Sequence, residues 1–207
     1  MRIIAGEFRH RRLLANPGLT TRPITDRAKE ILFERIQDLL VDKRVVDIFA
    51  GTGSLGLEAL SRGAQSVVFL ESDKRAFELL EQNVAALGVE DRALCWRTDA
   101  LNSSFHPKGV DEFLPFEVVF FDPPYRLAEK LRPESPMSKA LVRLARNTVT
   151  ADTALLFFRV PKRTSLELPA CWEHDQARAI SSMEIHVFKK ATERLEPPSA
   201  DPSPIEC

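Results

Sequence analysis

The residues best suited to chemistry lie in one short stretch, FFDPPY at positions 120–125, which holds the only tyrosine of the chain. Asp122 ends a hydrophobic run, and the prolines that follow it make a turn that no regular element continues. A carboxylate accepts N–H hydrogen bonds, so Asp122 could orient an amino group for attack on an electrophile. An aromatic ring beside it could stack on a base that has left its helix. The stretch therefore predicts a catalytic turn formed by Asp122, Pro123 and Tyr125.

A second stretch, DIFAGTGSLG at residues 47–56, is typical of a loop that binds a ligand with its backbone. Gly51 and Gly53 allow a tight turn and a close approach to a ligand, and the helix that follows offers free N–H groups. The spacing satisfies G-x-G-x-x-G, and Glu71 ends the next predicted strand. This context of strand, turn and helix predicts a nucleotide-type cofactor.

The position of one acid distinguishes two kinds of cofactor. In dinucleotide-binding loops the first glycine directly follows the strand, whereas here Asp47 lies inside the strand, four residues before Gly51. This form resembles the first motif of S-adenosylmethionine-dependent methyltransferases, in which such an acid helps to hold the ammonium group of the cofactor. By this resemblance Glu71 would accept hydrogen bonds from two ribose hydroxyls, and Asp99 would meet the adenine amino group.

Strands and helices alternate along the chain, which places these residues at one edge of a sheet. The pattern predicts an α/β fold, with a mostly parallel sheet covered by helices on both faces and an antiparallel hairpin at its edge. Asp122, the glycine loop and Glu71 would then share the carboxyl edge, where open sheets bind ligands. We expect strands at 45–49, 66–71, 92–97, 117–122 and 154–160 with a final strand stretch at 179–190, and helices at 25–40, 54–62, 74–87 and 136–149.

Charge is unevenly distributed, although the net charge of the chain is only −1. Residues 1–29 hold seven bases and two acids, which predicts a basic face at one end of the molecule. We expect three parts: an arm or hairpin at 1–24, a catalytic domain at 25–190, and a disordered, Pro/Ser-rich tail at 191–207. The bases expected to contact phosphates of a nucleic acid are Arg9, Arg11, Arg12, Arg22 and Arg27.

Composition excludes several classes of protein. The chain has 207 residues, 44% hydrophobic and 29% charged, which is typical of one globular domain of good size. No apolar stretch approaches the roughly 20 residues of a membrane span, and the first residues lack the apolar run of a signal peptide. The three cysteines form no CxxC and the four histidines are dispersed. We therefore expect a cytoplasmic protein that has no metal site and no association with a membrane. We also expect it to be a monomer.

Longer motifs resemble one family closely. MRIIAGEFR at the start, RPITDR at 22–27 and the glycine loop with its helix are similar to the bacterial small-subunit (16S) ribosomal RNA guanine-N2-methyltransferases. DPPY is the signature of amino-group methyltransferases. The resemblance implies a class I S-adenosylmethionine-dependent methyltransferase fold, Rossmann-like and seven-stranded, with an N-terminal hairpin. It also implies ribosomal RNA or the assembling small subunit as partner, Asp47, Gly51, Gly53, Glu71 and Asp99 as cofactor contacts, and the turn at Asp122 as the catalytic loop.

Two stretches depart from this family, and we expect both to lie away from the cofactor loop. Residues 181–188 replace a Gly-Asp-Thr-like turn and an aromatic pair, and the strand at 154–160 ends in Phe-Arg-Val, where an acidic ending is common. Three alternatives stay open on the sequence. They are an adenine-N6 methyltransferase, a nicotinamide-dependent oxidoreductase, which leaves DPPY unexplained, and an RNA-binding protein that has lost catalysis.

Overall fold

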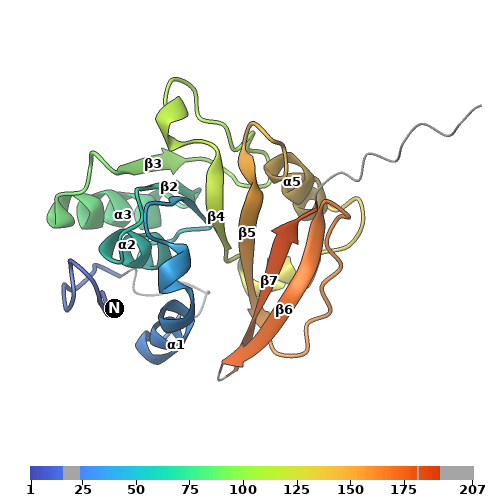
Figure 1. Cartoon of the computed structure of the whole chain (residues 1–207), viewed down its shortest axis with the longest axis horizontal. Coiled ribbons are helices and arrows are strands. Elements are labelled where there is room, and N and C mark those ends of the chain that lie inside the picture. Colours follow the sequence, from blue (N-terminus) through green and yellow to red (C-terminus); the bar gives the residue numbers. More distant parts are fainter. Residues whose placement is uncertain (16–23, 181, 192–207) are drawn as a thin grey trace, which may run out of the picture.

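The computed structural model describes residues 1–15, 24–180 and 182–191, and they form one twisted seven-stranded sheet with helices on both faces (Figure 1). The strands run in the order β3-β2-β1-β4-β5-β7-β6. The first five pair in parallel, and β7 pairs antiparallel with both β5 and β6. The strands are β1 (Arg44–Ile48), β2 (Ser66–Glu71), β3 (Ala93–Arg97), β4 (Phe116–Phe121), β5 (Thr150–Pro161), β6 (Trp172–Ile180) and β7 (Met183–Lys190).

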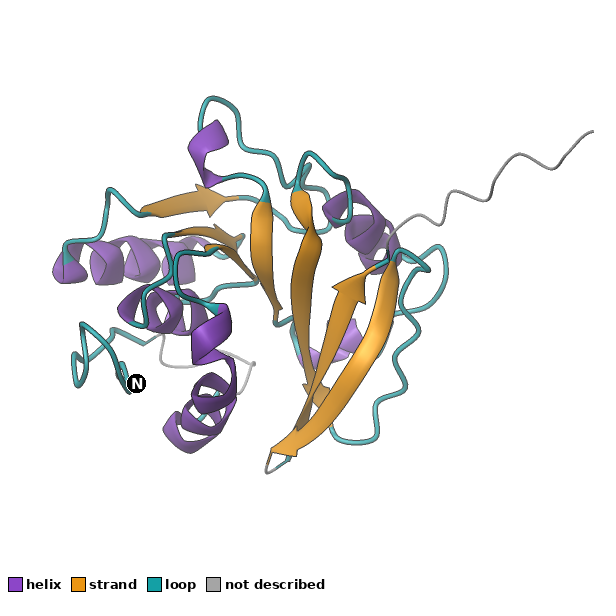
Figure 2. Cartoon of the chain, viewed as in Figure 1, coloured by secondary structure: helices purple, strands orange, loops and turns teal. Residues whose placement is uncertain are grey.

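The helices lie in two layers, one against each face of the sheet (Figure 2). Successive residues of a strand point to opposite faces, so Phe120 packs with α1, α2 and α3, while Phe121 packs with α4 and α5. The α-helices are α1 (Asp26–Ile36), α2 (Ser54–Ser61), α3 (Lys74–Leu87), α4 (Tyr125–Ala128) and α5 (Pro136–Leu144), with short 3-10 turns at Gln37–Leu39 and Asp111–Phe113.

Local sequence signals account for where these helices begin and end. The hydroxyl of Thr25 accepts from the backbone N–H of Ala28, and the carboxylate of Asp73 accepts from that of Ala76, so each residue caps a helix start. Gly88 ends α3 in the left-handed region, at φ 69°. The predicted helix at 136–149 is too long, since α5 ends at Leu144 and the chain turns before β5.

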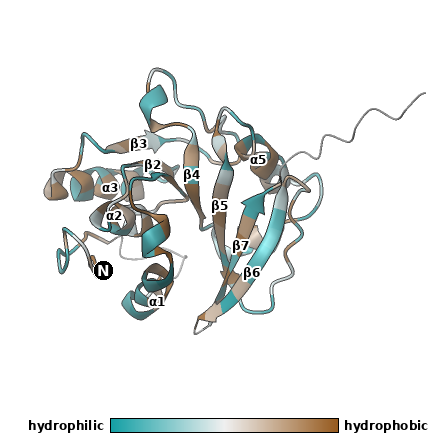
Figure 3. Cartoon of the chain, in the orientation of Figure 1, coloured by the Kyte–Doolittle hydropathy of each residue, from teal (hydrophilic) through white to brown (hydrophobic). Residues whose placement is uncertain are grey.

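The edge hairpin is where prediction and structure differ most. The predicted antiparallel pairing of the last stretch with β5 is confirmed. The strand β6, which lies between them in the chain, was not predicted, and of the predicted strand at 179–190 residues 183–190 form β7 while residues 179 and 180 end β6. Residues 173–179 of β6 are all exposed, and Figure 3 shows hydrophilic colour along much of this strand. An edge strand without a buried face carries no alternating hydrophobic pattern to reveal it.

The N-terminal arm packs as part of the domain. Arg2 and Arg12 form an antiparallel bridge, and the side chains of Ile3 and Leu13 are buried in the core. The backbone N–H of Glu7 donates to the carbonyl of Ser61 at 2.7 Å, which fastens the arm to the end of α2. Residues 16–23, which would complete the predicted arm, and the predicted tail from 192 onward lie outside the described residues. Among the helices that the structure describes, none is both long and apolar enough to cross a membrane.

Candidate active site

A cavity of about 420 Å³ lies at the carboxyl edge of the parallel strands. Its wall includes residues from the ends of β1, β2, β4 and β5, together with the glycine loop and the start of α4. Of the eight predicted cofactor and catalytic residues, six line this cavity: Asp47, Gly51, Glu71, Asp122, Pro123 and Tyr125. The two motifs that are some seventy residues apart in the sequence therefore meet in one site.

The two glycines of the loop have different tasks. Gly51 has φ 58°, and a Cβ atom added there would meet nothing within 4 Å, so its backbone borders open space in the cavity. Gly53, at φ 86°, caps α2, and an added Cβ atom would lie 2.5 Å from Cδ1 of Leu80. Gly51 can therefore approach a ligand, while Gly53 allows the loop to pack against α3.

Glu71 holds the glycine loop from the end of the neighbouring strand. Its Oε2 accepts from the N–H of Gly51 at 2.8 Å, and its Oε1 accepts from the N–H of Asp73 at 2.7 Å. Burial raises the pKa of this carboxyl, and the backbone N–H groups that it accepts oppose the rise. Each oxygen keeps a lone pair for a further donor, so the carboxylate can still receive two hydroxyl groups.

Asp47 is the most enclosed acid of the site, with 1% of its surface exposed. Its Oδ2 accepts from the N–H of Gly56 at 2.8 Å. Burial raises its pKa to about 8, and the nearby carboxyls of Asp122 and Glu71 add to the rise. A cation bound in the cavity would favour the ionised form of this acid. Asp47 is therefore suited to a ligand that carries an ammonium group.

Asp122 follows β4 and faces Arg159, a residue predicted to lie away from the site. The Nε of Arg159, on β5, donates to Oδ1 of Asp122 at 2.5 Å, and the two side chains are 9% and 14% exposed. The expectation that the Phe-Arg-Val ending lies away from the cofactor loop was wrong, because Arg159 lines the same cavity as the loop. The available signal was a single cation at the end of an otherwise apolar strand.

Tyr125 begins α4 directly after the two prolines. Its ring centroid lies 5.9 Å from Cζ of Arg159, and the residue is half-buried at the cavity wall. Pro124 is the N-cap of α4, so the rigid proline turn fixes the position of the ring relative to Asp122. A flat group that entered the cavity could lie against the tyrosine with its edge toward the carboxylate.

Asp99 is the predicted cofactor acid that, unlike Asp47 and Glu71, lies outside the cavity wall. It is exposed, and it does not line the cavity. Its Oδ1 accepts from the N–H of Leu101 at 3.0 Å and its Oδ2 from Nδ2 of Asn102 at 2.7 Å, so it organises the turn after β3. A contact with adenine stays a prediction for this residue.

The predicted phosphate-binding arginines lie on or near the arm, and they differ in whether their side chains already have a partner in the protein. Arg9 and Arg12 are exposed, whereas Nη2 of Arg11 donates to the carbonyl of Ala86 at 2.5 Å. Arg27 pairs with Glu30 at 2.9 Å on α1. Arg22 lies outside the described residues. The arm can thus present Arg9 and Arg12 to a ligand, while Arg11 helps to fasten the arm to α3.

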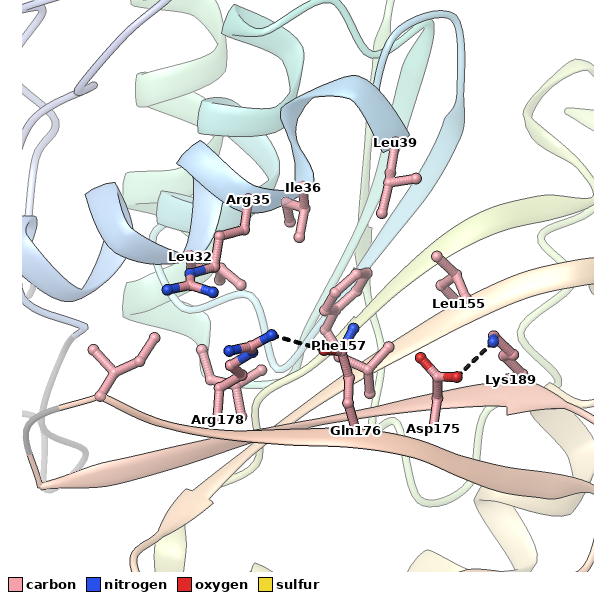
Figure 4. Close-up of a pocket in the computed structure, with 13 residues that line it drawn as sticks. Leu32, Arg35, Ile36, Leu39, Leu155, Phe157, Asp175, Gln176, Arg178 and Lys189 are labelled. Atoms are coloured by element: carbon pink, nitrogen blue, oxygen red, sulfur yellow. Dashed lines mark hydrogen bonds and ion pairs between the residues drawn. The ribbon is translucent and has the colours of Figure 1, made fainter.

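A second cavity of similar volume lies between α1 and the β6–β7 hairpin (Figure 4). Its wall is largely apolar, and three of its charged side chains, Asp175, Arg178 and Lys189, already have partners. Lys189 pairs with Asp175 at 2.5 Å, and Arg178 donates to Gln176 at 3.4 Å. None of the predicted site residues that the structure describes lines it. The cavity at the carboxyl edge is therefore the candidate active site.

Comparison with known proteins agrees with this geometry. The family model described as Conserved hypothetical protein 95 matches residues 1–189. Ribosomal RNA small subunit methyltransferase D of Escherichia coli is 31% identical over 193 residues, 92% of this chain and 90% of the relative. The protein of the same name from Haemophilus influenzae is 36% identical over 177 residues, 83% of this chain and 84% of its own length.

A solved structure extends the similarity to three dimensions. That of yhhF from Escherichia coli superposes with a TM-score of 0.74 at 31% identity, covering 92% of this chain and 97% of the other. The predicted fold class is confirmed, and with it S-adenosylmethionine as the cofactor of this fold. The chain belongs to the family described as Conserved hypothetical protein 95 and has the fold of the class I S-adenosylmethionine-dependent methyltransferases.

Proposed function

We propose that this protein transfers a methyl group from S-adenosylmethionine to the exocyclic N2 amino group of a guanine in small-subunit ribosomal RNA. The observation that carries the proposal is the enclosed Asp122 carboxylate, which shares one cavity with the glycine loop and Glu71. The names of the relatives in Escherichia coli and Haemophilus influenzae support ribosomal RNA as the substrate. The DPPY motif at 122–125 supports an amino group as the acceptor.

The residues of the glycine-loop side fit the cofactor. When bound, S-adenosylmethionine supplies a methyl group that its sulfonium already activates. Asp47 would face the ammonium group, and Glu71 would accept from the ribose hydroxyls. The backbone of Gly51, which faces open space, leaves room for a close approach. Asp99 would accept from the adenine amino group.

The residues of the proline turn fit the acceptor. The amino nitrogen of a base is a weak nucleophile, because its lone pair is conjugated with the ring. Asp122 and a backbone carbonyl of the turn would each accept a hydrogen bond from one of its two N–H groups. These bonds orient the nitrogen and raise the electron density of its lone pair. Tyr125 would hold the unstacked base flat against its ring. Asp122 and Tyr125 both act by positioning the base, so the rate of methyl transfer depends on how rigidly the turn holds these two side chains.

Glu71→Ala is expected to weaken binding of S-adenosylhomocysteine by about 1–3 kcal/mol, since ribose hydroxyls and the N–H groups of the loop would lose their acceptor. Isothermal calorimetry measures this change. Glu81→Ala, at an exposed position of α3, is the matched control and should bind like the original protein. Equal affinity of the Glu71 variant and the control would remove Glu71 from the cofactor site. NAD should give no binding heat with either protein.

Recognition of RNA is expected to depend on the exposed arginines of the arm. The double change Arg9→Ala and Arg12→Ala should weaken RNA binding and reduce the slope of log affinity against log salt by about one to two, because two phosphate contacts would be lost. Changing both residues to lysine keeps the charges and should keep most of the slope. An alanine variant with an unaltered slope would show that the arm does not meet phosphates.

The function itself is tested with substrate that lacks the modification. Naked 16S ribosomal RNA and small subunits from cells without this gene are incubated with the purified protein and S-adenosylmethionine labelled at the methyl group. After digestion to nucleosides, the label should elute with N2-methylguanosine from at least one of the two substrates. Label on adenosine, or no label with both substrates, would contradict the proposal.

A further inference from the structure

Arg159 is a charged side chain that enters the active-site cavity without a role in either predicted motif. The pairing of β4 with β5 sets Phe120 beside Phe157 and Phe121 beside Phe158. The next pair along the two parallel strands is therefore Asp122 with Arg159. Side chains at paired positions of parallel strands point to the same face, so the backbone register itself brings carboxylate and guanidinium together.

The bonds of Arg159 show that it serves the site more than the surrounding fold. Within the part of the chain that the structure describes, its guanidinium makes one hydrogen bond, from Nε to Oδ1 of Asp122, and its buried Nη1 has no partner. The buried Lys29 is a contrast, since its Nζ meets the carbonyl of Arg2, the hydroxyl of Ser54 and the carboxylate of Glu58. The N–H donors of a buried cation that stabilises the fold are normally all hydrogen-bonded, whereas a buried donor of Arg159 has no acceptor.

Charge explains what the single bond achieves. Asp122 follows β4. The ionisable side chains that line the same cavity are Asp47 on β1, Glu71 on β2, Asp73, Tyr125 and Arg126 at the start of α4, and Arg159 on β5. Two of these groups are basic: Arg126 is exposed, whereas Arg159 is the one that forms the ion pair with Asp122. Burial raises the pKa of Asp122, and the attraction of Arg159 opposes the rise. A protonated Asp122 would lose its negative charge, and an Oδ2 that carried the proton would donate a hydrogen bond and could not accept one from the target amino group.

We propose that Arg159 is a positioning residue for methyl transfer, which keeps the Asp122 carboxylate ionised and aimed while the target amino group binds to it. Nε holds Oδ1, so Oδ2 is left to face the substrate. The position of the guanidinium beside the Tyr125 ring also limits how far the carboxylate can turn. This inference rests on the proposed function for its role in the reaction, but the state of Asp122 can be tested without the reaction.

The first test measures the carboxyl group directly. Carbon-13 NMR follows the titration of Asp122 in the original protein and in the variants Arg159→Gln and Arg159→Lys. Without the guanidinium, the pKa of Asp122 should rise by about one to three units, and lysine, which keeps the charge, should restore most of the original value. An Asp122 titration that is the same in Arg159→Gln as in the original protein would overturn the inference.

The second test measures the consequence for the reaction as single-turnover rates against pH. The rate is lost when pH falls through the pKa of Asp122, so a higher pKa moves this loss to higher pH. Arg159→Gln should show the acidic limb shifted upward by about one unit or more, and Arg159→Lys should follow the original profile more closely. Arg146→Gln, which removes an exposed arginine that lines neither cavity, should leave the profile unchanged.

The outcomes separate this inference from the proposed function. Calorimetry with S-adenosylhomocysteine shows whether each variant keeps a folded cofactor site. If the original protein transfers no methyl group to ribosomal RNA, the proposed function fails, and the NMR titration still decides the role of Arg159 toward Asp122. If transfer occurs but Arg159→Gln and Arg159→Lys lose rate equally, with no shift of the acidic limb, Arg159 is a packing residue and the inference is wrong.

Discussion

Asp122→Ala is expected to slow methyl transfer by about 10²-fold or more, while affinity for S-adenosylhomocysteine stays within a few-fold of the original value. The substitution removes an acceptor for the target amino group, and it leaves the glycine loop and its bonds to Glu71 in place. The substitution should therefore lower the rate of the methyl-transfer step itself. Single-turnover kinetics with saturating RNA measure that step, and calorimetry checks the cofactor.

Substitutions of Tyr125 give the matched comparison at the same turn. Tyr125→Phe keeps the ring and should retain most of the rate, whereas Tyr125→Ala removes a stacking surface worth about 1–3 kcal/mol. The rates should descend from the original protein through Tyr125→Phe and Tyr125→Ala to Asp122→Ala. A rate for Asp122→Ala equal to that of the original protein would reduce the FFDPPY stretch to a strand ending without chemistry.

Glu58→Ala is expected to lower the free energy of unfolding by about 3–5 kcal/mol, the largest effect on stability that we predict. Glu58 is fully buried on α2, and its Oε2 pairs with Nζ of the buried Lys29 at 3.2 Å. It also accepts from the backbone N–H groups of Ile4 and Ala5 in the arm. Removing the carboxylate leaves the buried Lys29 and Arg62 without their counter-charge, and it leaves the two N–H groups without an acceptor. Urea denaturation followed by circular dichroism measures the loss.

The control for this prediction is an exposed glutamate in a comparable helical pair. Glu78 lies 3.8 Å from Lys74 on α3, and about half of its side chain is exposed. Glu78→Ala should change the free energy of unfolding by less than about 0.5 kcal/mol, as is usual for surface pairs. If Glu58→Ala were as stable as this control, the buried network would not be what joins the arm to the domain.

The sequence was sufficient to predict those elements whose own residues carry a pattern that matches their burial or their hydrogen bonds. Buried parallel strands such as β2 and β4 are continuous apolar runs, and Thr25, Asp73 and Gly88 mark helix ends with local hydrogen bonds or backbone geometry. The glycine loop and the proline turn are local as well. Because parallel strands share one carboxyl edge, their meeting in one cavity followed from the topology.

The features of the site that could not be predicted from the sequence depend on contacts between residues that are far apart in the chain. Arg159 became part of the site because β5 pairs with β4 in one register, and no local pattern specifies which strands are neighbours. Asp99 matches the expected position along the chain, yet its side chain turns to its own loop, where Asn102 and the Leu101 N–H hold it. The bond from Arg11 to the Ala86 carbonyl is likewise visible only when the arm lies against α3.

The central claim, methylation of a guanine N2 amino group in small-subunit ribosomal RNA, is tested most directly in cells. Mass-spectrometric mapping of 16S ribosomal RNA is compared between cells with this gene, cells without it, and cells carrying only the Asp122→Ala form. We expect one N2-methylguanosine to be present in the first and absent from the other two. An unchanged set of methylated guanines in all three would contradict the claim.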